Sequence, residues 1–274
     1  MKKKVDVATT ITKENFAFVE IAGIEEENSK VKTLRFQAKL DAEPGQFVML
    51  WLPGVDAKPF GVMSQNNNDF AVTVARVGAF TEKLFALKKS DCIGVQGAFG
   101  KPFEIPAKAK RVACVAGGFG AAPLAFLAQR CAERGVRVVF FEGAKTQNDV
   151  ILEKRLRSLG CDFRLATDDG SLGFKGFCTE LFAKALKKEK FDAAFTCGPE
   201  KMMAAVVKIC KSRRLPLQFS LERFMKCGYG VCGNCACGSR LACIDGPVFS
   251  PRDLLELSDF GKARRDASGA VVPL

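Results

Sequence analysis

The stretch Cys227-Gly-Tyr-Gly-Val-Cys232-Gly-Asn-Cys235-Ala-Cys237-Gly-Ser-Arg-Leu-Ala-Cys243 decides how the rest of the chain is interpreted. Four of its cysteines, 227, 232, 235 and 243, follow the pattern Cys-x4-Cys-x2-Cys-x7-Cys. The first three have the spacing of plant-type 2Fe–2S sites, in which a short loop carries thiolates around a small cluster. Glycines between them allow the tight backbone turns that such a loop requires. The stretch therefore predicts a 2Fe–2S cluster bound by Cys227, Cys232, Cys235 and Cys243.

Two other interpretations of these cysteines remain open. A structural zinc site usually has two Cys-x2-Cys knuckles, and this stretch has one. Disulfides belong to oxidising compartments, but no signal peptide is recognisable and the twelve cysteines are otherwise scattered among apolar residues. Free cysteines instead indicate a reducing, cytoplasmic setting. Cys237 is the spare cysteine of the stretch, and we expect it to be a bystander.

The composition of the chain limits the classes of protein to which it can belong. The 274 residues suffice for about two domains, and 48% apolar with 26% charged residues is ordinary for a soluble globular chain. The formal charge of +12 would suit nucleic acid, but Lys and Arg are spread along the chain, which has one Trp and one Tyr. A basic surface suits anionic cofactors or an acidic partner equally well. We therefore predict no nucleic-acid binding. A basic zinc-binding nucleic-acid protein is the alternative from another class.

The chain contains no histidine. This excludes Ser–His–Asp chemistry, His-ligated zinc, a Rieske centre and a histidine proton shuttle. The chemistry is therefore expected to come from cofactors.

One segment, Val112 to Gln129, has eighteen residues without a charge, the lower limit for a membrane span. Its centre, Gly117-Gly-Phe-Gly120-Ala-Ala-Pro123, would break a helix in mid-bilayer. We therefore predict a strand, a glycine turn and a helix here, and no membrane association.

Between Asn15 and about Phe103, short apolar runs alternate with turn residues such as Pro44-Gly45. Regularly spaced short strands predict an all-β, antiparallel barrel, which we assign to residues 1–106. Thr81 is the expected N-cap of one helix, Glu82–Lys88. The predicted strands are Phe16–Ile21, Val31–Ala38, Gln46–Leu52, Phe70–Val77 and Cys92–Gln96.

From residue 107 to residue 218, strands alternate with helices of about ten residues, which predicts an α/β domain on a parallel sheet. Residues 219–274 then form a small C-terminal 2Fe–2S domain. The strands expected in the α/β domain are Arg111–Ala116, Val136–Phe141, Asp162–Thr167, Ala193–Thr196 and Leu217–Ser220. The expected helices are Pro123–Arg134, Val150–Leu159, Thr179–Lys188 and Glu200–Arg213.

Together with the cysteines, several motifs resemble the ferredoxin–NADP reductase superfamily, and within it the electron-transfer subunits of two-subunit, NAD-linked dihydroorotate dehydrogenases. The most specific match is Ser220-Leu-Glu-Arg-Phe-Met-Lys-Cys227 with the cluster cysteines and Asp245-Gly-Pro-Val-Phe249. Pro44-Gly-Gln-Phe-Val48 resembles the strand before the flavin motif, and Gly97–Phe103 the closing turn of the barrel. The resemblance covers nearly the whole chain. Fewer residues separate the third and fourth cluster cysteines than in the family, which implies a short hairpin.

The resemblance implies an FAD site on the barrel. Lys58-Pro-Phe-Gly-Val-Met-Ser64 occupies the flavin motif, and Val77-Gly-Ala-Phe-Thr81 resembles the loop and helix that hold the pyrophosphate. Lys58 replaces the usual Arg, which keeps the charge but loses the planar fork. Gly61 stands where the family's Ser would meet the flavin ring. The implied flavin-binding residues are Lys58, Pro59, Phe60, Gly61, Val62, Gly78, Phe80 and Thr81.

The α/β domain carries the expected nucleotide site. The glycines of Gly117–Pro123 would let the backbone approach a pyrophosphate at a helix N-terminus. Asp168 and Cys197-Gly-Pro199 follow other strands, at the edge where open α/β sheets bind ligands. The resemblance places Cys197 near the nicotinamide. Glu142, at the end of the second strand, is expected to accept ribose hydroxyls, which favours NAD, with NADP possible. The implied nucleotide-binding residues are Gly117, Gly118, Gly120, Pro123, Asp168, Cys197, Gly198 and Pro199.

The resemblance implies an oxidoreductase subunit that passes electrons between a partner, the 2Fe–2S cluster, FAD and NAD. The partner would be an FMN-containing dihydroorotate dehydrogenase catalytic subunit, in a heterotetramer. No catalytic acid or base is then expected in this chain. The alternative is the same module in a hydrogenase or a bifurcating NADPH–ferredoxin reductase complex.

Overall fold

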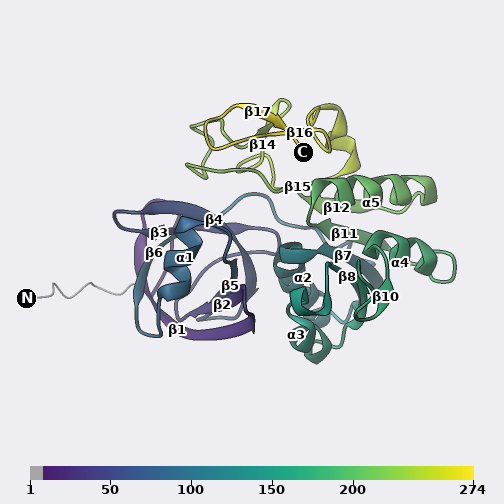
Figure 1. The fold of residues 1–274 in the computed structure, drawn as a ribbon, viewed down its shortest axis with the longest axis horizontal. Helices are drawn as coiled ribbons and strands as arrows, with labels where there is room; N and C mark the ends of the chain where they lie inside the picture. The colour runs from purple at the N-terminus through teal and green to yellow at the C-terminus, as the bar shows by residue number, and fades with distance from the viewer. Residues whose placement is uncertain (1–8) are drawn as a thin grey trace, which may run out of the picture.

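The computed structural model describes residues 9–274, so the first eight residues of the predicted barrel unit 1–106 lie outside the described residues. Figure 1 shows three parts: a barrel of early strands, a helix-flanked sheet beside it, and a C-terminal region lying across one side of both. The predicted combination of an antiparallel barrel, a parallel-sheet domain and a small C-terminal region is confirmed.

The barrel closes through the strand order β1-β2-β5-β4-β3-β6, with every neighbouring pair antiparallel. Its interior is apolar, with Phe36 and Phe70 stacked at a ring-centroid distance of 5.0 Å. Closure leaves no exposed sheet edge, so all six strands contribute to one core. The strands are β1 Ala17–Asn28, β2 Val31–Phe36, β3 Phe47–Leu52, β4 Asp56–Gln65, β5 Phe70–Ala75 and β6 Cys92–Phe99.

Two of the differences from the sequence prediction concern a barrel strand and the start of the barrel helix. Strand β4 was not predicted, because Pro59 and Gly61 interrupt the alternation by which a strand is recognised. The predicted start of the barrel helix at Glu82 is wrong: α1 spans Ala79–Ala86 with Gly78 as N-cap. Thr81 lies inside the helix, and its hydroxyl accepts hydrogen bonds from the backbone N–H groups of Val77 and Gly78. A side chain three residues into a helix can satisfy these N–H groups as an N-cap would.

The second part is a seven-stranded sheet of order β10-β9-β8-β7-β11-β12-β15. All its pairs are parallel except β12–β15. Strand β7 is buried almost throughout, as expected for a parallel strand covered on both faces. The strands are β7 Arg111–Gly117, β8 Arg137–Ala144, β9 Asp162–Thr167, β10 Phe174–Lys175, β11 Ala193–Cys197, β12 Leu217–Ser220 and β15 Val248–Phe249.

Helices cover the sheet, and one of them joins it to the barrel. Helix α2 contacts barrel strand β4 as well as β7 and β8. Helix α4 contacts β7, β8 and β9, and α5 contacts β11 and β12. The barrel and the sheet therefore share α2 as a common wall. The helices are α2 Ala121–Glu133, α3 Glu153–Ser158, α4 Cys178–Ala185 and α5 Glu200–Arg213, with 3-10 turns η1 Gly118–Gly120 and η2 Gln147–Asp149.

The C-terminal region contains two small hairpins and a short 3-10 helix, η3 Pro251–Leu255. The first hairpin pairs β13 Ala236–Cys237 with β14 Arg240–Leu241, which confirms the short hairpin expected between the last two cluster cysteines. The second pairs β16 Ala263–Arg265 with β17 Val271–Pro273. The region is bound to the sheet by β15, which pairs with β12.

The long uncharged segment forms β7, η1 and α2, as predicted. Within residues 9–274, no helix combines the length and apolar character that a membrane crossing requires.

Candidate functional site

A cavity of about 670 Å³ lies where the three parts of the molecule meet. Its volume falls within the range usual for cofactor and ligand sites. On the sheet side it is lined by Phe119, Ala122, Pro123 and Cys197, and on the C-terminal side by the segment 220–225. The barrel side supplies most of the predicted flavin residues, namely Lys58, Pro59, Phe60, Gly61, Gly78, Phe80 and Thr81.

Lys58 is the charged group of the flavin motif. Its ammonium lies 2.6 Å from a carboxylate oxygen of Asp56 and 4.7 Å from the ring centroid of Phe224. The side chain is half-buried, so the charge acts partly desolvated and close to the cavity. The neighbouring Gly61 packs against α2, since a Cβ there would lie 3.6 Å from the Cβ of Pro123. Lys58 therefore offers a positive charge for a phosphate at the edge of the cavity.

The N-terminus of α1 opens on the same cavity. Gly78, Phe80 and Thr81 all line it, and the Thr81 hydroxyl donates to the Gly78 carbonyl at 2.9 Å. The positive end of the helix dipole favours an anion there. Together with Lys58, this end of the cavity suits a pyrophosphate.

The glycine loop after β7 is packed against the loop after β11. A Cβ on Gly120 would lie 2.2 Å from the carbonyl oxygen of Cys197, and one on Gly117 would lie 2.8 Å from Pro199. The two loops can meet at this distance only because these positions lack side chains. Phe119, between the glycines, is half exposed and reaches the cavity. The structure thus brings the two predicted nucleotide loops together at the carboxyl edge of the sheet.

The inner side of the cavity carries a thiol and a carboxyl group. Cys197 Sγ lies 4.0 Å from Glu222 Oε1. Burial, and then the nearby Glu222, raises the pKa of Cys197, so it remains a thiol. Burial also raises the pKa of Glu222. Sequence reasoning assigned Glu222 and Phe224 only to a cluster motif. Their place beside the flavin motif depends on a contact between distant segments, and no local signal shows it.

Several predicted cofactor residues do not line this cavity. Val62 is fully buried in the barrel core, because the strand alternation turns it inward. Asp168 is exposed at the end of β9, where its N–H donates to the Ala144 carbonyl at 3.0 Å. The others are the glycine-loop and β11-loop positions Gly117, Gly118, Gly120, Gly198 and Pro199.

The expectation that Glu142 contacts a ribose is wrong. Strand β8 continues to Ala144, and Glu142 is completely buried within it. Its Oε1 accepts a hydrogen bond from Ile151 N–H at 3.0 Å, and its Oε2 has no hydrogen-bond partner among the described residues. Burial raises the pKa of Glu142 to about 8. Its burial keeps the carboxyl group away from any ligand at the sheet edge.

The four predicted cluster cysteines lie in two pairs. Cys232 N–H lies 3.5 Å from Cys227 Sγ, and Cys235 Sγ lies 3.3 Å from Cys243 Sγ. Cys235 and Cys243 are buried and Cys232 is exposed. The loop between the members of the first pair has Gly230 at φ +87°, a left-handed conformation that glycine adopts without strain.

Two pairs of cysteines fit the ligand arrangement of a two-iron cluster. Across residues 9–274, no group of three or more His, Cys, Asp or Glu side chains is placed to hold one ion. In a 2Fe–2S cluster each iron takes two of the four thiolates. Two thiolates on one tetrahedral ion, at about 2.3 Å each, lie roughly 3.8 Å apart, close to the spacing of the Cys235–Cys243 pair.

The ionisation of the cysteines also suits ligands. The pKa of Cys235 is lowered to about 6, chiefly by the hydrogen bond between the Cys235 and Cys243 sulfur atoms, and the same hydrogen bond raises the pKa of Cys243. Burial tends to raise the pKa of Cys227, but backbone N–H groups of Cys232 and Tyr229 outweigh it and lower the pKa to about 7. Cys237 differs: it is buried in another apolar cluster, and Arg223 Nη2 donates to its Sγ at 3.1 Å.

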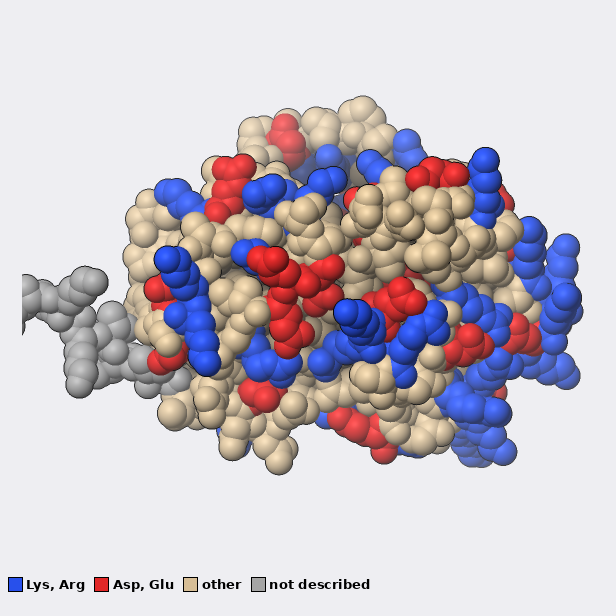
Figure 2. Space-filling model, turned by 60° about the horizontal axis from the view of Figure 1, so that its bottom comes forward, with Lys and Arg blue, Asp and Glu red and all other residues tan. Residues whose placement is uncertain are grey.

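A second hollow of about 720 Å³ lies next to the cysteine loop. Cys243 and Tyr229 line one side of it, and Lys13 and Lys101 line the barrel side. On the face shown in Figure 2, Lys and Arg side chains are spread widely and gather at the end where Figure 1 places α4 and α5. Groups of Asp and Glu lie between them, so this face has no continuous basic stripe.

Comparison with solved structures defines the class of protein. The chain is similar to a structure of an NADH-dependent reduced ferredoxin–NADP oxidoreductase, with TM-score 0.78 and 29% identity over 89% of this chain and 94% of that one. It also shares the fold of phthalate dioxygenase reductase, with TM-score 0.61 and 18% identity over 72% of this chain and 64% of that one. The chain is thus a reductase of the ferredoxin–NADP reductase type, with a barrel followed by a parallel sheet.

Comparison with known sequences defines the family. Residues 222–255 match the iron–sulfur cluster binding domain of dihydroorotate dehydrogenase B. A probable electron transfer subunit of dihydroorotate dehydrogenase B (NAD(+)) from Methanocaldococcus jannaschii is 45% identical, over 92% of this chain and 96% of the relative. One from Pyrococcus furiosus is 40% identical, over 89% of this chain and 94% of the relative. This chain belongs to the family of electron transfer subunits of NAD-linked dihydroorotate dehydrogenase B.

The cysteine pairing predicts the metal content. Protein purified without oxygen should contain about two irons and two acid-labile sulfides per chain. Serine at position 227, 232, 235 or 243 should remove most of this iron, whereas Cys237→Ser, at a buried position outside the two pairs, should retain it. Stoichiometric zinc without sulfide would contradict the assignment.

Lys58→Ala should weaken flavin retention. Loss of its charge near the pyrophosphate end should raise the dissociation constant for FAD roughly tenfold, with unchanged iron content. The matched control is Lys32→Ala: Lys32 also pairs with a carboxylate and stands over a ring, 5.2 Å from the Phe85 centroid, but lies outside the cavity. Equal loss of flavin and iron from Lys58→Ala would indicate unfolding instead.

Glu142 predicts a pH-dependent stability. Its pKa is about 8 in the folded chain, against an ordinary value of 4.5. Between pH 4.5 and pH 8 the folded state therefore binds more protons than the unfolded state. Its contribution is fully present below pH 4.5 and is lost as the pH rises through 8. At pH 8.5, Glu142→Gln should raise the free energy of unfolding by on the order of a few kcal/mol, with little gain at pH 5. Denaturant unfolding measures this, with the exposed Glu26→Gln as control; a pH-independent gain would exclude the explanation.

Proposed function

We propose that this chain transfers electrons between NAD and an FMN-containing dihydroorotate dehydrogenase catalytic subunit. It binds FAD in the 670 Å³ cavity and a 2Fe–2S cluster at Cys227, Cys232, Cys235 and Cys243. One observation carries this proposal: the cavity wall formed by residues 220–225 leads directly into Cys227. A single segment therefore joins the flavin site to the cluster site.

The residues of the cavity bind and orient; none acts as a strong acid or base. When bound, FAD supplies the exchange between the hydride chemistry of nicotinamide and the one-electron chemistry of the cluster. Lys58 and the N-terminus of α1 hold the pyrophosphate end of FAD, and Phe60 and Phe80 give that end an apolar wall. Cys197 and Glu222 line the inner end of the cavity, where the flavin ring and the nicotinamide ring meet.

The nucleotide site follows the carboxyl edge of the sheet. The close-packed glycine loop, with Gly118 and Gly198, lets the backbone approach the pyrophosphate of NAD. Asp168, exposed at the end of β9, is the carboxylate that accepts ribose hydroxyls, in place of the buried Glu142. Its negative charge disfavours the 2′-phosphate of NADP.

The partner docks beside the cysteine loop. Tyr229, Val231 and Ile244 are 55%, 78% and 48% exposed, so apolar surface surrounds the cluster cysteines. Val248 and Phe249, a few residues further along the chain, are buried in the core and do not contribute. The assembly is a heterotetramer that involves neither membrane nor nucleic acid.

Twelve free cysteines support a reducing cytoplasmic setting. The working units are residues 1–106, 107–218 and 219–274.

The second candidate is the same module in a bifurcating reductase or hydrogenase complex. The 29% identity to the NADH-dependent ferredoxin–NADP oxidoreductase supports it. The 45% identity to a probable dihydroorotate dehydrogenase B subunit favours the first proposal.

The isolated chain should reduce artificial acceptors with NADH and be inert toward dihydroorotate. Mixed with the FMN-containing subunit, it should confer NAD-dependent orotate formation. Cys235→Ser should abolish this coupling, whereas Cys237→Ser should preserve it. Coupling at full rate without the cluster would refute the electron path, and absence of binding to that subunit would favour the second candidate.

A further inference from the structure

A buried ion pair lies behind the cavity wall. Arg223 belongs to the wall, and Glu200 is the first residue of α5. Arg223 Nη1 pairs with Glu200 Oε1, and Arg223 Nη2 lies 3.2 Å from Glu200 Oε2. The two side chains are 0% and 6% exposed, so water screens their attraction very little.

The pair also makes three further hydrogen bonds, to two other segments. Arg223 Nη2 donates to Cys237 Sγ at 3.1 Å, in the β13–β14 hairpin, which we call the cluster hairpin. It also donates to the Ala263 carbonyl of β16 at 3.3 Å, in the C-terminal hairpin β16–β17. Glu200 Oε2 accepts a hydrogen bond from Gly261 N–H at 3.0 Å. One guanidinium thus links α5, the cavity wall, the cluster hairpin and the C-terminal hairpin.

Each partner is adjacent to a group that faces the cavity. Glu200 directly follows the loop Cys197–Pro199, which is packed against the glycine loop. Arg223 directly follows Glu222, and Arg223 Nη1 donates to the Glu222 carbonyl at 3.1 Å. On the other side of Arg223 is Phe224, the ring that lies 4.7 Å from the Lys58 ammonium. The β11–β12 pairing already places Cys197 beside Ser220, and the Arg223–Glu200 pair adds a second link between the two segments that carry Cys197 and Glu222.

Stability alone is a weak explanation for such a pair. Removing two charges from water is unfavourable, and apolar side chains of similar size often give equal or greater stability. Arg223 supplies a planar fork that reaches several acceptors in fixed directions, which lysine cannot reproduce. These properties favour a role in positioning.

On the basis of the proposed function, we propose that Arg223, held by Glu200, is a positioning residue for the redox site. It fixes the cavity wall relative to the nucleotide loops, so that FAD retention and NADH binding depend on it together. Its side chain is fully buried behind the wall and does not face the cavity. It acts through Cys197 and Glu222 on one side and through Phe224 and Lys58 on the other.

The test is Arg223→Lys, which keeps the charge and loses the fork. The Michaelis constant for NADH with ferricyanide and the dissociation constant for FAD should each rise about tenfold, which corresponds to a loss of about 1.4 kcal/mol of binding free energy. The turnover number with saturating FAD and NADH should change less than about twofold, and iron content should remain unchanged. Glu200→Gln, which keeps one acceptor oxygen for Arg223, is the second variant if Arg223→Lys does not fold, and should give the same joint shift.

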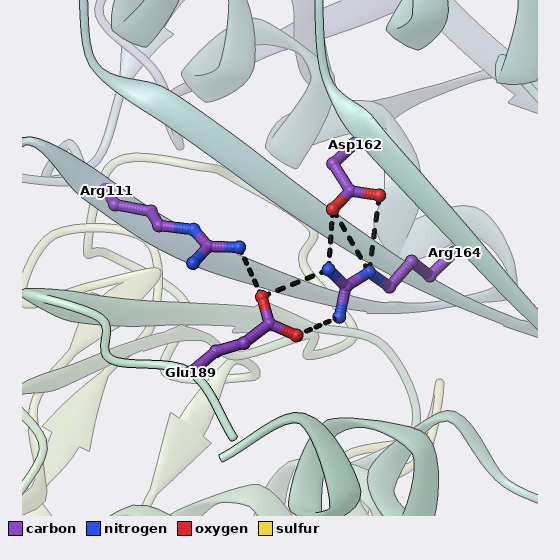
Figure 3. Close-up of polar contacts among 4 residues, drawn as sticks. All are labelled: Arg111, Asp162, Arg164 and Glu189. Carbon is purple, nitrogen blue, oxygen red and sulfur yellow. Dashed lines mark hydrogen bonds and ion pairs between the residues drawn. The ribbon is translucent and has the colours of Figure 1, made fainter. Parts of the chain in front are cut away.

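The control is a similar ion-pair network at the opposite edge of the sheet. Figure 3 shows Glu189 between Arg111 and Arg164, with Asp162 on the far side of Arg164. Arg164 Nη1 lies 2.6 Å from Glu189 Oε1, and none of the four residues lines the cavity. Arg164→Lys should therefore lower the melting temperature at most, with both constants unchanged.

The outcomes separate this inference from the proposed function. If the wild-type chain binds no FAD or fails to oxidise NADH, the proposed function is wrong. If the wild-type chain does both, and Arg223→Lys and Glu200→Gln lower only the melting temperature, as Arg164→Lys does, then Arg223 is purely structural and the inference is overturned.

Discussion

The pairing of β12 with β15 is the constraint on which the redox site depends. Phe219 pairs with Phe249 and Ser220 with Val248, so the chain leaves the sheet and returns to it at adjacent positions. The cysteine loop and the cavity wall lie between these two strands in the sequence. Both ends of that insertion are therefore fixed by backbone hydrogen bonds to a buried sheet. A loop held in this way can carry a cluster and line a cavity with little freedom to move.

Two sets of buried polar groups differ in their relation to this insertion. The buried pair of Arg223 and Glu200 crosslinks it to α5, whereas Glu142, whose Oε2 has no hydrogen-bond partner within residues 9–274, lies away from it in β8. These groups have different consequences. A charged pair with several acceptors restricts geometry, whereas a lone buried carboxyl group mainly makes stability depend on pH. The chain contains no histidine, and in the proposed function its side chains position cofactors that carry the electron chemistry.

Sequence patterns predicted the elements whose signals are local. Parallel strands such as β9 and β12 were predicted at their observed bounds, because a short apolar run between turn residues is diagnostic of a buried strand. Strand β4 was missed because Pro59 and Gly61 interrupt its pattern. The ribose assignment of Glu142 failed because β8 continues three residues further than the apolar run indicated. A strand end is set by its pairing partners, which the local sequence does not contain.

The sequence by itself determined the class of the protein and the ligand chemistry. Cysteine spacing, glycine loops and the flavin motif depend on neighbouring residues, and the covalent chain fixes their separation. Only the tertiary structure decided which of these residues meet. It placed Glu222 and Phe224 against Cys197 and Lys58, and paired the cysteines two by two. It also showed that Gly120 is required by a carbonyl oxygen 2.2 Å from where its Cβ would be. Such contacts join residues far apart in sequence, and their geometry comes from the packing of the barrel, the sheet and the cysteine loop together.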